Sequence, residues 1–223
     1  HADANYNLAI TLSDQGNHDD AVAYYRQAIT SQPDHVQAHS NLGVIYKNQG
    51  NHEAALEHYS QALRIAPDRP MSLYNLGNLY LDRGQLDEAI TTLSRVAQLA
   101  PQFADTHYNL GNAYLQKNDF DAAITCFNRS IDIRPAYANA HFNRATALFG
   151  IDNLPEAWQA YEWRWHTDDF KNQYKYNPNQ EWKPGTKQNT FIWAEQGIGD
   201  EILFASMVSE FHDVSKAVTL SVD

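Results

Sequence analysis

The stretch PMSLYNLGNLYLDRGQLDEAITTLSRVAQLAPQF, residues 70–103, contains the pattern on which the fold depends. Its apolar residues recur every three or four positions on both sides of Gly84, which is typical of two amphipathic helices joined by a turn. Glycine tolerates the left-handed backbone that such a turn often needs. Pro101, near the end of the stretch, terminates the second helix. The stretch therefore predicts one helix–turn–helix unit.

The same unit recurs along the chain without an insertion or a deletion. Prolines stand 34 residues apart at Pro33, Pro67, Pro101 and Pro135. The eighth position of every unit is small, which lets two helices approach (Ala9, Gly43, Gly77, Gly111, Ala145), and the twentieth is always alanine. Since no single helix pair buries its apolar face, neighbouring pairs should stack. The sequence predicts an all-α solenoid of five repeats at residues 2–35, 36–69, 70–103, 104–137 and 138–165.

These recurring residues resemble the tetratricopeptide-repeat (TPR) family over about residues 2–165, and 34 residues is the period of that family. The resemblance implies a right-handed superhelix in which the first helix of each repeat lines a concave face. It also implies that the second, fifth, sixth, ninth, twelfth and thirteenth positions face inward, and that the solenoid is a scaffold for protein–protein interaction.

Two inward positions carry the candidate site. The sixth position is always asparagine: Asn7, Asn41, Asn75, Asn109, Asn143. A side-chain amide both donates and accepts hydrogen bonds, as a peptide bond does. This regular series resembles the asparagine ladder of O-linked N-acetylglucosamine transferases, which implies a grip on an extended protein segment. The fifth position adds aromatic contact area through Tyr6, Tyr74, Tyr108 and Phe142.

Each of these residues also has a structural alternative. The asparagines could bond a neighbouring repeat, and the aromatic side chains could pack between adjacent first helices. The sequence leaves both alternatives open.

Charge restricts the partners. The net charge of −11 argues against nucleic acid and anionic membranes, both of which need a basic surface. Among the inward positions, Lys47 is the one base, against four acids: Asp3, Asp14, Asp82 and Asp105. We therefore expect a neutral or basic ligand segment, and not the carboxylate clamp known from chaperone-binding TPR proteins.

Other features of the sequence point away from cofactors and membranes. No stretch is long and apolar enough for a membrane span. The single cysteine, Cys126, fits a reducing compartment, so we expect a cytoplasmic, bacterial protein. The ten histidines form no metal-binding motif and are expected to be scattered over the surface. No metal and no cofactor are predicted.

The chain changes character after the fifth repeat. The aromatic cluster Trp158, Tyr161, Trp163 and Trp165 is expected to cover the end of the solenoid, and residues 166–189 to form a linker. Residues 190–194 and 217–222 then predict strands, with a loop at 195–199 and a helix at 200–212. This order predicts a βαβ unit.

The string WAEQGIGDEILFASM, residues 193–207, resembles bacterial TPR proteins that continue into a GT-B glycosyltransferase domain of the heptosyltransferase and O-GlcNAc transferase type. The resemblance implies that residues 190–223 begin a Rossmann-like GT-B lobe in which Asp200 acts as general base. An N-cap role is the preferred interpretation of Asp200. Because the sequence ends two strands into that lobe, we expect no enzyme activity from this chain by itself.

The sequence leaves three alternative hypotheses about function. The first is a scaffold that holds an extended protein segment in the TPR groove, as the substrate-holding arm of a larger glycosyltransferase. The second is a glycosyltransferase parent in which the repeats serve folding or oligomerisation. The third is a structural module that self-associates through its repeats.

Overall fold

The computed structural model describes residues 1–168, 189–193 and 217–221, which belong to two units that divide after Phe170. The first unit is all-helical. Its ten α-helices are α1 (Ala2–Asp14), α2 (His18–Ser31), α3 (Val36–Asn48), α4 (His52–Ile65), α5 (Pro70–Asp82), α6 (Leu86–Leu99), α7 (Ala104–Gln116), α8 (Phe120–Ile133), α9 (Ala138–Gly150) and α10 (Leu154–Tyr161). A 3₁₀ helix, η1 (Glu162–His166), follows them. The predicted TPR-like solenoid is confirmed over this unit.

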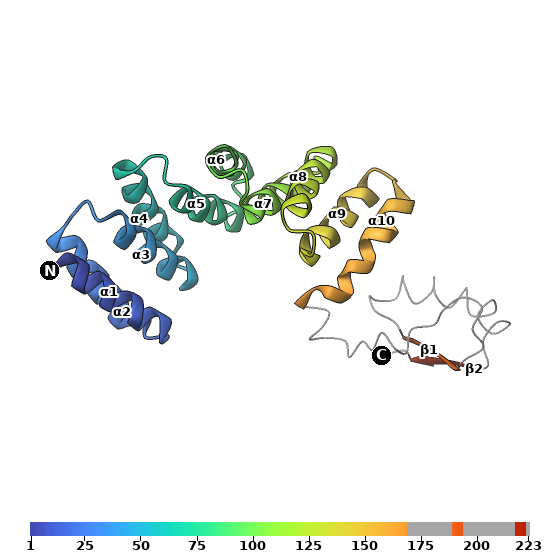
Figure 1. Ribbon diagram of the computed structural model, residues 1–223, viewed down its shortest axis with the longest axis horizontal. Coiled ribbons are helices and arrows are strands. Elements are labelled where there is room, and N and C mark those ends of the chain that lie inside the picture. The colour runs from blue at the N-terminus through green and yellow to red at the C-terminus, as the bar shows by residue number, and fades with distance from the viewer. Residues whose placement is uncertain (169–188, 194–216, 222–223) are drawn as a thin grey trace. The chain divides into compact units, whose positions relative to one another are not determined.

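Each repeat is one pair of antiparallel helices, and successive pairs stack side by side. Within the first unit, α3, α5, α7 and α9 lie on the inner side of a curved row and α4, α6 and α8 on its outer side (Figure 1). Successive first helices also touch one another, α3 with α5, α5 with α7, and α7 with α9. Positions five, six and nine of neighbouring repeats are thereby brought together on the inner side.

The turn inside each pair uses the left-handed backbone that the sequence predicts. Gly16, Gly50 and Gly84 have φ between +68° and +78°. The last two repeats place Asn118 and Asp152 at this point, each with φ of 58°. Asparagine and aspartate are the side chains that best tolerate this conformation, so the turn is preserved without glycine.

The core alternates small and large residues at fixed repeat positions. Tyr25, Tyr59, Leu93 and Phe127 occupy the twenty-fourth position and are almost fully buried. In the middle three repeats these side chains lie flat against the glycine of the eighth position: a Cβ built at Gly43, Gly77 or Gly111 would stand 2.4–2.6 Å from a ring or isobutyl carbon. The short side chain at position eight is thus what allows the two helices of a repeat to pack.

Three histidines hold the junctions between repeats, contrary to the expectation that histidines are scattered over the surface. His39, His107 and His141 share the fourth repeat position, and each Nε2 donates to the carbonyl oxygen of the preceding repeat's proline, at 3.2, 3.1 and 2.9 Å. His39 is only 7% exposed. The proline ends one helix pair, and the histidine fastens that end to the next pair.

His39 also pairs with a second histidine. His58 in α4 places its Nδ1 3.1 Å from Nδ1 of His39, and its ring stacks on Tyr46. Because His39 Nε2 donates to a carbonyl, neutral His39 accepts at Nδ1, and His58 is the donor. A proton on His39 Nδ1 would replace this hydrogen bond with two opposed N–H groups.

This histidine pair predicts loss of stability in mild acid. Burial, and then the neighbouring His39 and Arg26, lower the pKa of His58 below 6.5, while Glu57 opposes them. Burial, and less strongly His35 and Arg64, lower the pKa of His39, against the Pro33 hydrogen bond and Glu57. A histidine whose pKa is lower in the folded chain than in the unfolded chain contributes its full stability at pH values above the unfolded pKa of 6.5. That stability is lost as pH falls through 6.5 towards the folded values.

We therefore expect the urea midpoint to fall between pH 7.5 and pH 5, and His58→Phe to flatten this fall because a neutral ring keeps the stacking on Tyr46. His18→Phe, at an exposed histidine of α2, is the control and should leave the pH dependence as it is. Equal slopes for wild type and His58→Phe would contradict the assignment.

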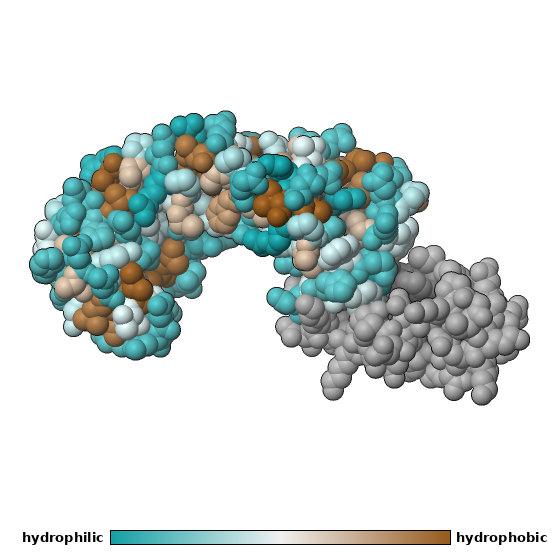
Figure 2. All heavy atoms as spheres, in the orientation of Figure 1, coloured by the Kyte–Doolittle hydropathy of each residue, from teal (hydrophilic) through white to brown (hydrophobic). Residues whose placement is uncertain are grey.

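The end of the fifth repeat is covered only in part. Trp163 in η1 stacks on His141, with ring centroids 3.9 Å apart, and the Arg164 guanidinium lies over Tyr161. Trp158, however, remains 49% exposed beside the exposed Leu154 and Ile151. The aromatic cover is therefore made by η1 together with Tyr161 of α10, which packs on Phe142 and Phe149, while Trp158 contacts Phe149 by one edge. Figure 2 shows hydrophobic side chains of the repeats interspersed with hydrophilic ones on the visible face.

In the second unit the structure describes two strands, β1 (Asn189–Trp193) and β2 (Ala217–Ser221). They pair in parallel, with Asn189 opposite Ala217 and Trp193 opposite Ser221. The predicted loop and helix between them, the linker up to residue 188, and Asp200 lie outside the described residues. The βαβ unit as a whole, and its likeness to a GT-B lobe, stay predictions.

Candidate functional site

The asparagines of the sixth position lie along the first helices, in three different settings. Asn109 and Asn143, in α7 and α9, are half-buried and bond to the repeat before them. Asn41 donates to the hydroxyl of Tyr25 at 3.1 Å. Asn7 is exposed on α1, and Asn75 is half-buried on α5. Neither of these last two makes a side-chain hydrogen bond within the described part of the chain.

The same arrangement of side-chain hydrogen bonds occurs twice along repeats three to five. Asn109 Nδ2 donates both to Tyr74 Oη at 3.1 Å and to Asn78 Oδ1 at 2.6 Å. One repeat further on, Asn143 Nδ2 donates to Tyr108 Oη at 3.2 Å and to Asn112 Oδ1 at 2.8 Å. We call Asn78–Asn109 and Asn112–Asn143 the amide pairs. In each pair, a tyrosine from the fifth position fixes the orientation of the amide.

The amide pairs leave a particular set of groups unused. Both N–H groups of Asn109 and of Asn143 are taken, so the remaining acceptor is the Oδ1 atom. Asn78 and Asn112 accept through Oδ1 and keep the two N–H groups of Nδ2. Each pair thus offers an acceptor from one side chain and a donor from the other. A peptide bond needs both.

Sequence reasoning missed Asn78 and Asn112, although they occupy the ninth, inward position. Asparagine recurs there only in repeats three and four, whereas repeats one and two have Ile10 and Val44. The local repeat of the two asparagines, 34 residues apart, was the signal that could have found them. The structural alternative for the sixth position, a bond to a neighbouring repeat, accounts for the Nδ2 groups of Asn109 and Asn143 but not for their oxygens.

The aromatic residues of the fifth position pack against the residue that closes their own repeat. Tyr6 lies on His35, Tyr74 on Phe103, and Tyr108 on Tyr137, with ring centroids 4.6, 4.8 and 4.9 Å apart. Phe142 instead contacts Tyr161. These rings are half-buried, so they build the inner surface while leaving part of each face open.

Two of the four inward acids are neutralised by the chain itself. Lys47 Nζ lies 2.9 Å from Asp82, and Arg134 pairs with Asp105. Asp3 and Asp14, both in α1, have no lysine or arginine partner within the described residues. The uncompensated negative charge of the inner surface is therefore concentrated in the first repeat.

The described residues give little support for metal binding, a reactive thiol or a membrane-spanning helix. They include no group of three histidine, cysteine, aspartate or glutamate side chains that could hold a metal ion. Burial raises the pKa of Cys126 to about 11, which keeps this thiol protonated and unreactive at neutral pH. Within the same part of the chain, no helix has the length and apolar character of a membrane span.

Comparison with known proteins agrees with the repeat architecture. Family models described as tetratricopeptide repeat match residues 6–70 and 58–91, and a model described as TPR repeat matches residues 77–117 and 111–151. No curated protein sequence matches the chain.

Several solved structures share the fold at low identity. MamA (residues 41 to the end) from Desulfovibrio magneticus is 20% identical with a TM-score of 0.67, covering 77% of this chain and 96% of that one. YrrB, described as a TPR protein with an unusual peptide-binding site, is 20% identical with a TM-score of 0.65, covering 76% and 87%. A PilF structure from Pseudomonas aeruginosa is 24% identical with a TM-score of 0.67, covering 73% and 74%.

Proposed function

Because the chain is a tetratricopeptide-repeat protein, we propose that it is a protein-interaction scaffold whose inner surface holds an extended protein segment by its backbone. The observation that carries the proposal is the pair of amide units, Asn78–Asn109 and Asn112–Asn143. Each presents a free oxygen beside a free Nδ2 on adjacent first helices. The description of YrrB as a peptide-binding TPR protein supports the same function.

The proposed contact recognises the backbone of the bound segment and not its side chains. A peptide N–H would donate to Oδ1 of Asn109 or Asn143, and a peptide C=O would accept from Nδ2 of Asn78 or Asn112. Tyr74 and Tyr108 hold the amides in position beforehand, which lowers the entropy cost of binding. We include Asn7, Asn41 and Asn75 in the same row as single-residue contacts, with Tyr6, Tyr74, Tyr108 and Phe142 supplying apolar area.

The sharpest test changes the ligand-facing donors and keeps the internal bonds. Asn78→Asp and Asn112→Asp retain an oxygen that accepts from Asn109 and Asn143, but they replace the free Nδ2 with a carboxylate oxygen. We expect each change to weaken binding of an extended peptide about tenfold, because about 1.4 kcal/mol is lost with one or two backbone hydrogen bonds. A peptide selected from a random library on the full chain, measured by fluorescence anisotropy, gives the readout.

Asn128→Asp is the matched control, since Asn128 is exposed on the outer helix α8 and its change adds the same charge. If Asn78→Asp and Asn112→Asp bind the selected peptide as tightly as the control does, the amide pairs are not the contact. N-methylation of the peptide backbone should weaken binding of the wild type and have less effect on the double variant.

We further propose that the held segment is an acceptor for a glycosyltransferase domain of the same protein. The support is the likeness of residues 193–207 to GT-B proteins and the parallel pairing of β1 with β2, which a Rossmann-like lobe requires. In that setting Asp200 is the candidate general base. Incubating the full-length protein with nucleotide sugars and the selected peptide tests this role, and no transfer to the peptide from any sugar nucleotide would reject it.

A further inference from the structure

One place on the inner surface recurs in repeats one, three and four with different chemistry. It lies where the second and fifth positions of a repeat meet the thirty-first and thirty-fourth, at the end of the second helix. In repeat four these residues are Asp105, Tyr108, Arg134 and Tyr137. We call this place the junction site of a repeat.

The junction site of repeat four holds an arginine of the chain itself. Arg134 Nη1 and Nη2 donate to Asp105 Oδ1 and Oδ2 at 3.1 and 2.9 Å. The guanidinium carbon stands 4.4 Å from the centroid of the Tyr137 ring, whose hydroxyl donates to Asp105 at 2.9 Å. Partial burial alone would raise the pKa of Asp105, but the bonds from Arg134 and Tyr137 hold it below its usual value. Carboxylate and ring together form a complete guanidinium site.

The junction site of repeat one has the same frame without the arginine. Asp3 stands in place of Asp105, Tyr6 in place of Tyr108, and His35 in place of Tyr137, while Gln32 replaces Arg134. The ring pairs have nearly the same geometry: Tyr6 and His35 lie 4.6 Å apart at 38°, and Tyr108 and Tyr137 lie 4.9 Å apart at 40°. Since the shorter Gln32 does not reach across as an arginine does, an open pocket of about 330 Å³ remains.

The lining of this pocket is suited to a cation. Besides the four residues of the frame, it includes Asp34, Asn7 and Gln37, and it contains no lysine or arginine. His35 is 7% exposed and accepts from the Ala38 N–H through Nδ1, so the neutral ring carries its proton on Nε2. That Nε2 lies 3.9 Å from Asp3 Oδ1, beyond hydrogen-bond distance. The carboxylate of Asp3 therefore remains available to an incoming group.

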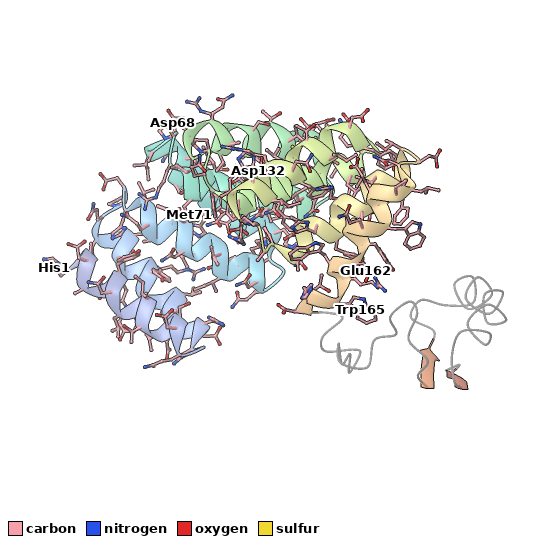
Figure 3. The ribbon with its side chains drawn as sticks, turned by 45° about the vertical axis from the view of Figure 1, so that its right-hand side comes forward. His1, Asp68, Met71, Asp132, Glu162 and Trp165 are labelled. Atoms are coloured by element: carbon pink, nitrogen blue, oxygen red, sulfur yellow. The ribbon has the colours of Figure 1, made fainter. Side chains whose placement is uncertain are left out.

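Repeat three provides an internal contrast. Its junction site has Met71, Tyr74, Ala100 and Phe103, and Tyr74 packs on Phe103. The pocket there, of about 410 Å³, is lined by Met71, Ala100 and Phe103 together with Arg69 and Pro70. Met71 is 52% exposed and can be located in Figure 3. The ring pair is retained but the acid is absent. The aspartate is thus the feature that separates a cation site from an apolar one.

We propose that the junction site of repeat one binds an arginine side chain of the protein segment held by the groove. Asp3 would accept the two guanidinium N–H groups as Asp105 does, the Tyr6–His35 ring pair would lie against the planar group, and Asp34 would add negative charge. A planar, bidentate donor fits this frame better than the point charge of lysine. The occupant rests on the proposed function, because it presumes a bound segment, whereas the chemistry of the pocket does not.

A small probe separates the two proposals. Titration of the ¹⁵N-labelled full chain with N-acetyl-arginine methylamide should shift amide signals of residues 3–7 and 32–38 at millimolar concentration. The lysine analogue should bind several-fold more weakly, and the uncharged citrulline analogue should produce no saturable shifts. Equal shifts from all three analogues, or shifts elsewhere only, would overturn the assignment.

Two variants and two controls complete the test. Gln32→Arg supplies the pocket with its own arginine, as in repeat four, and Asp3→Asn removes the carboxylate; each should weaken probe binding at least tenfold. Asp19→Asn, at an exposed acid of the second helix α2 outside the pocket, should not change it. Unaltered probe binding in Gln32→Arg would reject the proposal. Asn78→Asp with Asn112→Asp should leave the probe bound, so failure of the backbone contact and failure of the arginine pocket give different results.

Discussion

Phe127→Ala is expected to lower the free energy of unfolding by about 3–5 kcal/mol, the usual cost of removing a fully buried ring. Phe127 has no exposed surface, and it packs among Ala123, Ala140 and Ala147 of repeats four and five. These alanines are too short to fill the cavity that the substitution would leave. Urea unfolding followed by circular dichroism measures the change.

The position of Phe127 in the array adds a qualitative expectation. In a repeat protein, stability is a sum of repeat and interface terms, so a deep loss in repeat four should separate the unfolding of its neighbours. We expect a broader or biphasic transition for Phe127→Ala. Trp158→Ala removes a larger side chain that is 49% exposed and is the control, with a smaller loss and a single transition. A larger loss from Trp158→Ala would contradict the placement of the core.

The start of each repeat could be predicted because the repeat length is 34 residues throughout, so each position is observed four or five times. Helix α7, for example, begins at Ala104, where the alignment places the start of repeat four. The residues of the aromatic cover at the end of the solenoid were predicted, but the 3₁₀ helix that holds Trp163 and Trp165 was not. A helix as long as the second helices of the other repeats would continue beyond Tyr161, but the chain forms η1 instead. Because this change occurs only once, no repeated sequence pattern predicts it.

The candidate site was predictable only as a set of positions. Asn109 could be placed on the inner side from its register, but its partner Asn78 lies 31 residues away on another helix. Whether two such side chains meet depends on how far the stacked helices are offset along their axes, and sequence periodicity does not determine this offset. The same limit applies to Arg134 and Asp105, which are 29 residues apart.

The histidine interpretation was wrong for a related reason. His39, His107 and His141 share a repeat position, but counting histidines without aligning them hides this. Their function is a side-chain bond to a proline carbonyl six residues earlier, across a turn between repeats. A tetratricopeptide alignment shows the recurrence, and only the structure shows the acceptor.

Sequence differences between the repeats are therefore more informative about binding than the residues that all the repeats share. The eighth position stays small in every repeat opposite the large side chain of the twenty-fourth, which keeps the helix pair packed, as with Gly77 against Leu93. The junction site varies without such a constraint, with an acid pocket in repeat one, an apolar pocket in repeat three and a closed ion pair in repeat four. Differences that packing does not require are the ones expected to select a ligand.

The packing constraint itself can be tested at Gly111, where we expect Gly111→Leu to lower the free energy of unfolding by about 3 kcal/mol. A Cβ at this residue would stand 2.5 Å from the Phe127 ring, so the leucine side chain and the ring compete for one space. Alanine occurs at this position in repeats one and five, as Ala9 and Ala145, which is why the test uses leucine.

If that competition is the cause, the size exchange Gly111→Leu with Phe127→Ala should recover part of the loss. The new isobutyl group would occupy the cavity left by the ring, and the double variant should be more stable than the sum of the two single changes predicts, by about 1–3 kcal/mol. Urea midpoints of the four proteins measure this coupling. Additive losses would mean that Gly111 matters for its backbone alone, since a helix that merely needed flexibility there would gain nothing from a smaller side chain at residue 127.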